Sequence, residues 1–116
     1  MIREGQIVVF TFPQTNLGPS KLRPALVLQK LPGKYNDWLT CMVTSKLNQQ
    51  IHSLDELVSG TDSDYSSSGL KAPSVIRITR LAVQDSLLIR GTIGEISPER
   101  LIRIRLNLSR WISGSQ

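Results

Sequence analysis

The chain has 116 residues, of which 14 are Lys or Arg and nine are Asp or Glu, which gives a formal charge of +5. This length suits one domain, residues 1–116, so we look for a single site and not an interdomain cleft. No apolar run is long enough to cross a bilayer, and one cysteine cannot form an internal disulfide, so we expect a cytoplasmic protein. The excess positive charge favours a polyanionic partner.

Two prolines mark the first two predicted strands. Gln6–Phe12 is rich in β-branched and aromatic residues and Pro13 follows it, which is typical of a strand and its exit turn. Residues 14–21 read as a loop. Pro24 fixes φ at the start of the next apolar run, so we expect the second strand to begin at Pro24. Arg23 would then lie at the junction between loop and strand.

The middle of the chain predicts three further strands. Residues 38–45 form the third, and the polar segment 60–69 predicts a surface loop. Residues 74–81 alternate, so Ile76 and Ile78 should lie on one face while Arg77 and Thr79 leave the core on the other. Residues 86–96 read as a strand that two glycines bend or bulge.

The C-terminal segment alternates as a strand would, but its start carries helix signals. Ser97, Pro98 and Glu99 provide an N-cap, a first-turn proline and a first-turn acid. A helical wheel puts Arg103 and Arg110 opposite one apolar stripe, which consists of Leu101, Ile104, Leu108, Trp111 and Ile112. We therefore predict a helix that covers one side of a small, strongly bent antiparallel sheet or barrel.

The available side chains restrict the chemistry. One histidine, His52, and one cysteine, Cys41, cannot build a Cys/His zinc site, and no paired acids suggest magnesium, so we expect no metal and no cofactor. No phosphate-binding glycine loop or catalytic triad can be argued from spacing.

Arginines and hydroxyls remain, and they suit a substrate that carries its own nucleophile. In RNA the 2′-hydroxyl can attack the adjacent phosphorus, while a guanidinium opposes the developing charge and hydroxyls position the phosphate. The candidates for these roles are Arg23, Arg77, Thr44 and Ser45. The alternative is that both arginines are solvated strand-edge cations that deter aggregation.

Five stretches, "GQIVVFTFP", "KLRPALVLQ", "MVTSKL", "GLKAPSVIRI" and "IGEISPERL", resemble in their order the PemK/MazF family of toxin endoribonucleases. The resemblance implies an SH3-like barrel of the PemK/MazF/CcdB type with a C-terminal helix, and a homodimer. It also implies the toxin of a type II toxin–antitoxin system, neutralised by a cognate antitoxin and able to bind DNA with it. The implied activity is metal-independent cleavage of single-stranded RNA that leaves a 2′,3′-cyclic phosphate.

In the family, the Arg of the Arg-Pro step and the Thr of the Thr-Ser step are the principal site residues, which here are Arg23 and Thr44, with Ser45 as a lesser candidate. Some members also use the arginine that corresponds to Arg77, with an acid where this chain has Thr79. The resemblance leaves the general base open. We expect RNA contacts at Lys21, Pro24, Lys46 and Thr79, with the loop 13–21 flanking the groove.

Two other functions stay open. A gyrase inhibitor resembling CcdB would need a C-terminal Trp-Gly-Ile, whereas Trp111 is followed by Ile112 and a polar tail, and the helical stripe makes Trp111 look like core. A nonenzymatic nucleic-acid binder would bind RNA with steep salt dependence but release no product.

Overall fold

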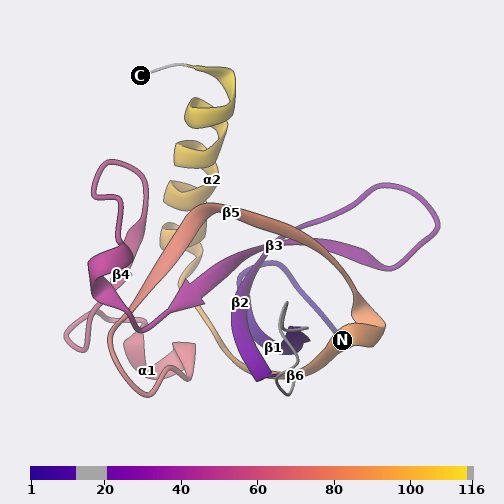
Figure 1. Ribbon diagram of the computed structural model, residues 1–116, viewed down its shortest axis with the longest axis horizontal. Helices are drawn as coiled ribbons and strands as arrows, with labels where there is room; N and C mark the ends of the chain where they lie inside the picture. Colours follow the sequence, from indigo (N-terminus) through magenta and orange to yellow (C-terminus); the bar gives the residue numbers. More distant parts are fainter. Residues whose placement is uncertain (13–20, 115–116) are drawn as a thin grey trace.

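The computed structural model describes residues 1–12 and 21–114, except the side chains of Phe12 and Lys21. It is mainly β, as predicted, with a long C-terminal helix (Figure 1). The strands are β1 (Gln6–Phe12), β2 (Lys21–Lys30), β3 (Asp37–Thr44), β4 (Glu56–Val58), β5 (Ser74–Asp85) and β6 (Ile89–Glu95). The helices are α1 (Tyr65–Ser68), α2 (Pro98–Ser113) and two 3-10 turns, η1 (Leu47–Gln49) and η2 (Ser86–Leu88).

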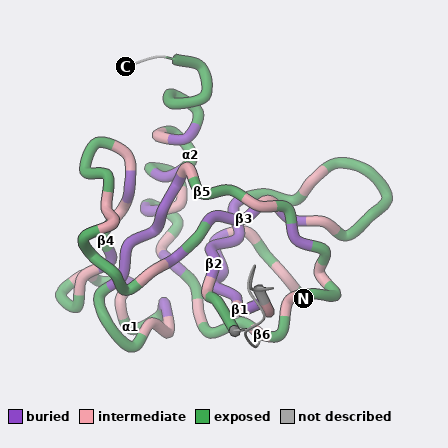
Figure 2. The backbone as a smooth tube through the Cα atoms, viewed as in Figure 1, coloured by how far each residue is buried: buried purple, intermediate pink, exposed green. Residues whose placement is uncertain are grey.

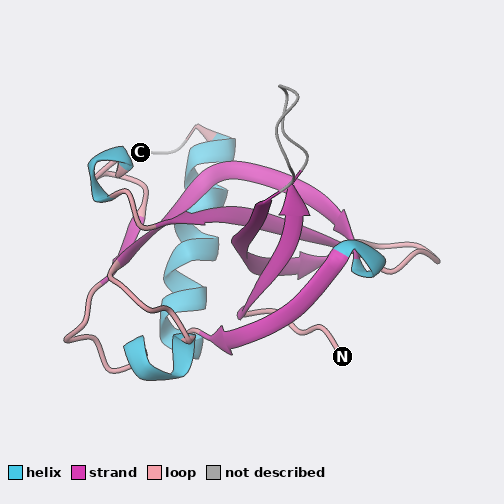
Figure 3. Ribbon diagram, turned by 60° about the horizontal axis from the view of Figure 1, so that its bottom comes forward, coloured by secondary structure: helices cyan, strands magenta, loops and turns pink. Residues whose placement is uncertain are grey.

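All six strands belong to one antiparallel sheet with the order β4-β5-β3-β2-β1-β6. Register shifts interrupt the pairing of β1 with β6, of β2 with β3 and of β3 with β5. Such bulges bend a sheet, and Figure 3 shows the strands curling round one end of the molecule. Within the described residues, β4 and β6 remain the two edges, so the expected barrel closure is not observed.

The central strands are buried on both faces. Because side chains alternate along a strand, Leu26 and Leu28 enter one core and Ala25 and Val27 enter another. Figure 2 shows these strands as the buried interior of the molecule. Because each face of β2 packs against a core, the residues after Pro24 are apolar without the polar alternation of a half-exposed strand.

Helix α2 covers the larger core and begins where the sequence predicts. The side chain of Ser97 accepts a hydrogen bond from the backbone N of Arg100, and Ile104 and Leu108 are buried. The prediction that Trp111 belongs to the core is wrong, because its exposed fraction is 44%. In the last turns of α2, Leu108, Ser109 and Ile112 are the residues that face Leu28 and Leu39 of the sheet, and Trp111 is not among them. Figure 1 shows α2 as the long C-terminal helix.

Arg100 ties the start of α2 to the rest of the fold. Its guanidinium donates to Asp64 at 2.8 and 3.0 Å, to Asp62 at 3.0 Å, and to the Glu56 carboxylate and Leu57 carbonyl at 2.9 and 3.1 Å. The hydrogen bond from Arg100, together with one from the backbone N of Ser97, lowers the pKa of Asp64 to about 2. This arginine therefore fastens α2 to β4 and to the segment before α1.

Three predicted boundaries need correction. The second strand begins at Lys21 and not at Pro24, because β1 pairs with the three residues before the proline. The segment 60–69 contains helix α1 and is not wholly on the surface, since Asp64 and Ser68 are buried. In the segment 86–96, the 3-10 turn η2 precedes β6.

Helix α1 and β6 approach closely at two glycines, Gly69, which directly follows α1, and Gly94 in β6. A Cβ on Gly94 would overlap the carbonyl groups of Ser67 and Ser68, and one on Gly69 would overlap the carbonyl of Ile93. Gly69 also has a φ of 73°, which disfavours any larger residue.

No helix in the described part of the chain has the length and apolarity needed to cross a membrane.

Candidate functional site

Pro24 ends the pairing of β2 with β3. The backbone N of Gly5, next to β1, donates to the carbonyl of Val27, so Val27, Ala25 and Arg23 direct their backbone groups toward β1. The nitrogen of Pro24 consequently faces β3, where it has no hydrogen to donate. The β2–β3 ladder stops at the pair Ala25↔Met42, and Figure 1 shows the end of β3 running away from the start of β2.

Arg23 and Thr44 lie beyond this last pair, one on each strand. Arg23 shares a face with Ala25, and Thr44 shares a face with Met42. Because Ala25 and Met42 are partners, Arg23 and Thr44 lie on the same face of the sheet. Arg23 is exposed and has no ion-pair or hydrogen-bond partner for its side chain among the described residues. Nothing in that part of the chain neutralises its charge.

The turn after β3 orients the hydroxyl of Thr44. The backbone N of Lys46 donates to Thr44 Oγ1 at 3.1 Å. Because the oxygen accepts this bond, its own hydrogen is left to donate elsewhere. Ser45 and Lys46 are exposed beside it.

Arg77 is held differently from Arg23. Its side chain is only 9% exposed, its Nε donates to Asp55 at 3.1 Å, and its Nη1 donates to Gln49 at 3.0 Å. It leaves the apolar core, as predicted, since Ile76 and Ile78 fill that core while Arg77 points to the other face. The alternative of a solvated strand-edge cation is wrong for Arg77, because η1 and the Asp55 carboxylate cover it.

Asp55 organises this part of the site, and the sequence analysis did not identify it. Its buried carboxylate accepts from Arg77 and from the backbone N of Ile51 and of Ile78, at 2.9–3.1 Å. The β5 partner of Met42 is Arg77 and that of Cys41 is Leu81, so residues 78–80 form a bulge without partners on β3. Asp55 thus accepts the bond that Ile78 cannot give to β3. The sequence analysis predicted no strand at 56–58, so it gave no reason to single out Asp55.

A pocket of about 490 Å³ opens beside Arg77, lined by Met42, Gln49, Arg77 and Arg80. Gln49 and Arg80 are further residues that the sequence analysis missed. Thr79 is half-buried in the same bulge, and Pro24 is half-buried opposite Val9. The side chain of Lys21 and residues 13–20, expected to flank the groove, lie outside the described residues.

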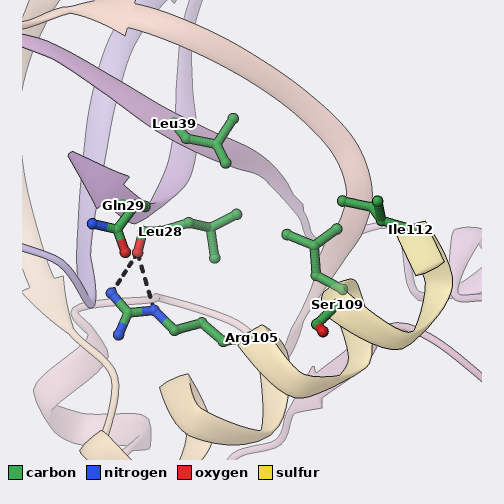
Figure 4. A pocket seen from close by; sticks show the side chains of 7 residues that line it. Leu28, Gln29, Leu39, Arg105, Ser109 and Ile112 are labelled. Carbon is green, nitrogen blue, oxygen red and sulfur yellow. Dashed lines mark hydrogen bonds between the residues drawn. The ribbon is translucent and has the colours of Figure 1, made fainter. Parts of the chain in front are cut away.

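A second, mostly apolar cavity of about 310 Å³ lies between α2 and the sheet (Figure 4). Leu28, Gln29 and Leu39 line it from the sheet, and Arg105, Leu108, Ser109 and Ile112 line it from α2. Arg105 donates twice to the carbonyl of Leu28, at 3.2 and 2.7 Å, where the register of β2 with β3 shifts. This arginine satisfies a strand carbonyl and closes one end of the cavity.

The described residues contain no group of three His, Cys, Asp or Glu side chains that could hold a metal ion. A comparison with curated proteins found no match to the chain. The family model described as "PemK-like, MazF-like toxin of type II toxin-antitoxin system" matches residues 3–112. Together with the antiparallel sheet and C-terminal helix, this match means that the chain belongs to the PemK/MazF-like toxin family of type II toxin–antitoxin systems.

Proposed function

We propose that this toxin is an endoribonuclease that cuts single-stranded RNA in the cytoplasm, with Arg23 and Thr44 as its principal catalytic residues. The observation that carries the proposal is that an exposed guanidinium, without a partner in the described part of the chain, and an oriented hydroxyl lie on one sheet face where the β2–β3 ladder ends. Endoribonuclease activity is typical of the family.

In the proposed reaction, the 2′-oxygen of the substrate bonds to the adjacent phosphorus and the bond from phosphorus to the 5′-oxygen breaks. The products are a 2′,3′-cyclic phosphate and a 5′-hydroxyl. Arg23 holds the non-bridging oxygens and stabilises the charge that they gain as phosphorus becomes pentacovalent. Thr44, whose oxygen already accepts from Lys46, donates its hydrogen to the same phosphate. Ser45 is a second donor to this phosphate.

The remaining proposed RNA contacts are Lys21, Pro24, Lys46 and Thr79. Lys46 is exposed next to Thr44, so its ammonium can contact the phosphate backbone. Pro24 lies directly beyond the last β2–β3 pair, Ala25↔Met42, where the two strands separate. We also propose that the cognate antitoxin competes with RNA for the face that carries Arg23, because an acidic segment would complement the same unpaired charge.

The test uses purified protein, a long unstructured RNA and EDTA, with both fragment ends mapped. We expect the wild type to produce 2′,3′-cyclic ends, and Arg23→Ala to lose cleavage while keeping its urea midpoint, because this side chain has no partner among the described residues. Arg110→Ala is the matched control, since Arg110 is an exposed arginine in the last turn of α2. Equal cleavage by Arg23→Ala and the wild type would remove Arg23 from the mechanism, and binding without any product would reduce the protein to a nonenzymatic RNA binder.

A further inference from the structure

Arg77 has one nitrogen that the fold does not use. Its Nε and Nη1 donate to Asp55 and Gln49, whereas Nη2 has no protein partner among the described residues. In the same residues, no buried side-chain nitrogen or oxygen lacks a partner. Nη2 must therefore reach solvent, and Arg77 lines the pocket with Met42 and Arg80. A side chain that is 91% buried thus keeps a charged donor available at that opening.

The other polar groups at this pocket are donors as well. An arginine cannot accept a hydrogen bond, so the oxygen of Gln49 faces Arg77 and its amide nitrogen remains as a donor. Arg80 is exposed and has no ion-pair or hydrogen-bond partner in the described residues. The carboxylate of Asp55 already accepts three hydrogen bonds, at 2.9–3.1 Å, and is fully buried.

The bulge in β5 explains why two arginines meet here. Residues 78–80 have no partners on β3, so Arg80 does not follow the alternation that Arg77 begins. Asp55 stabilises the bulge, because its carboxylate accepts a hydrogen bond from the backbone N of Ile78 within it. Met42, the partner of Arg77, supplies an apolar wall that is 37% exposed.

We infer that this pocket binds a phosphate of the RNA chain other than the one that is cut. Two guanidiniums and an amide donor suit an acceptor-rich anion, and none of the lining residues is an aromatic ring on which a base could stack. Met42 and Thr44 are two residues apart on one face of β3, about 7 Å along the strand. One strand can therefore place neighbouring phosphates in the pocket and at Thr44. The inference rests on the proposed function and assigns Arg77 to binding, with Asp55 and Gln49 as its positioning residues.

The experiment measures binding of a fluorescent 2′-O-methyl RNA, which cannot be cut, as a function of salt. We expect Arg80→Ala to bind about tenfold more weakly at moderate salt. It should also lower the slope of log affinity against log salt by about 0.7, the value for one phosphate contact on a single strand. Arg110→Ala, which removes the same charge from α2, should leave the slope unchanged.

A second pair of variants changes only the charge of the pocket. Met42→Glu places a carboxylate at its wall and should weaken binding at least as much as Arg80→Ala, whereas Met42→Gln, of the same size, should not. Equal slopes for Arg80→Ala and Arg110→Ala, with intact wild-type cleavage, would overturn the inference and leave the proposed function standing. A changed preference for the cut sequence in Arg80→Ala would also overturn it, because the pocket would then read a base. If the wild type neither binds nor cuts RNA, both proposals fail.

Discussion

Lowering the pH should destabilise the fold by protonating Asp64, which pairs with Arg100 at the start of α2. Asp64 is 5% exposed and accepts from two nitrogens of Arg100 at 2.8 and 3.0 Å, and these contacts lower its pKa from 3.8 to about 2. At about 1.4 kcal/mol for each pKa unit, the difference corresponds to about 2 kcal/mol of folding free energy. Because the folded pKa is the lower one, this contribution is complete above pH 3.8 and is lost as the pH falls toward 2.

Urea unfolding at pH 7, 4 and 2.5 tests this reasoning on the wild type and on Asp64→Asn. At pH 7 we expect the variant to be less stable by about 2 kcal/mol, since Arg100 then keeps only part of its charge compensation. The two proteins should become more alike in stability as the pH falls toward 2, where about half of the wild-type carboxylate is protonated. Both proteins should still lose some stability as the pH decreases, because hydrogen bonds from Ser59 and Arg100 also lower the pKa of Asp62.

Glu99→Gln is the control for this experiment, because Glu99 is an exposed acid in the first turn of α2 without an ion pair in the described structure. It should follow the wild type at all three pH values. If Asp64→Asn loses as much stability between pH 4 and pH 2.5 as the wild type does, Asp64 does not hold α2 in the way described.

Two further predictions concern the contact between α1 and β6 and the face of α2. Gly94→Ala should destabilise the fold by about 1–3 kcal/mol in urea unfolding, because its Cβ would overlap backbone carbonyls, whereas Gly91→Ala, whose Cβ meets only a side-chain atom of Val9 at 3.9 Å, should change little. We propose that the homodimer expected for the family uses the exposed apolar residues of α2, so Ile102→Glu, at a side chain that is 58% exposed, should lower the mass measured by sedimentation, while Leu87→Glu on η2 should not. An unchanged mass for Ile102→Glu would exclude this face.

The features that local sequence determines could be predicted. The start of α2 depends on the side chain of Ser97, on a first-turn proline and on a first-turn acid, which are neighbours in the chain. The start of β2 was placed too late because its first three residues owe their strand conformation to β1, across a connection that carries no strand signal. The exposure of Trp111 could not be predicted, because a helical wheel groups side chains by direction but does not show which of them contact the sheet.

Buried charges were the hardest part of the site to predict. Asp55 and Arg77 are 22 residues apart, and Asp64 and Arg100 are 36 residues apart, so no local pattern links either pair. Composition marks each of these residues as a surface residue. Chemistry alone could suggest that arginines and hydroxyls cooperate, whereas only the fold separates an exposed arginine such as Arg23 from one held by a carboxylate, as Arg77 is.

Pro24 gives the sheet a permanent opening. The nitrogen of Pro24 has no hydrogen, so no rearrangement of side chains can give it a hydrogen bond to β3, and the β2–β3 ladder ends at the pair Ala25↔Met42. If the proposed function is correct, a ribose–phosphate chain would reach Arg23 and Thr44 without displacing backbone hydrogen bonds between β2 and β3. The fold itself therefore leaves the space between the start of β2 and the end of β3 open, and no substrate is needed to create it.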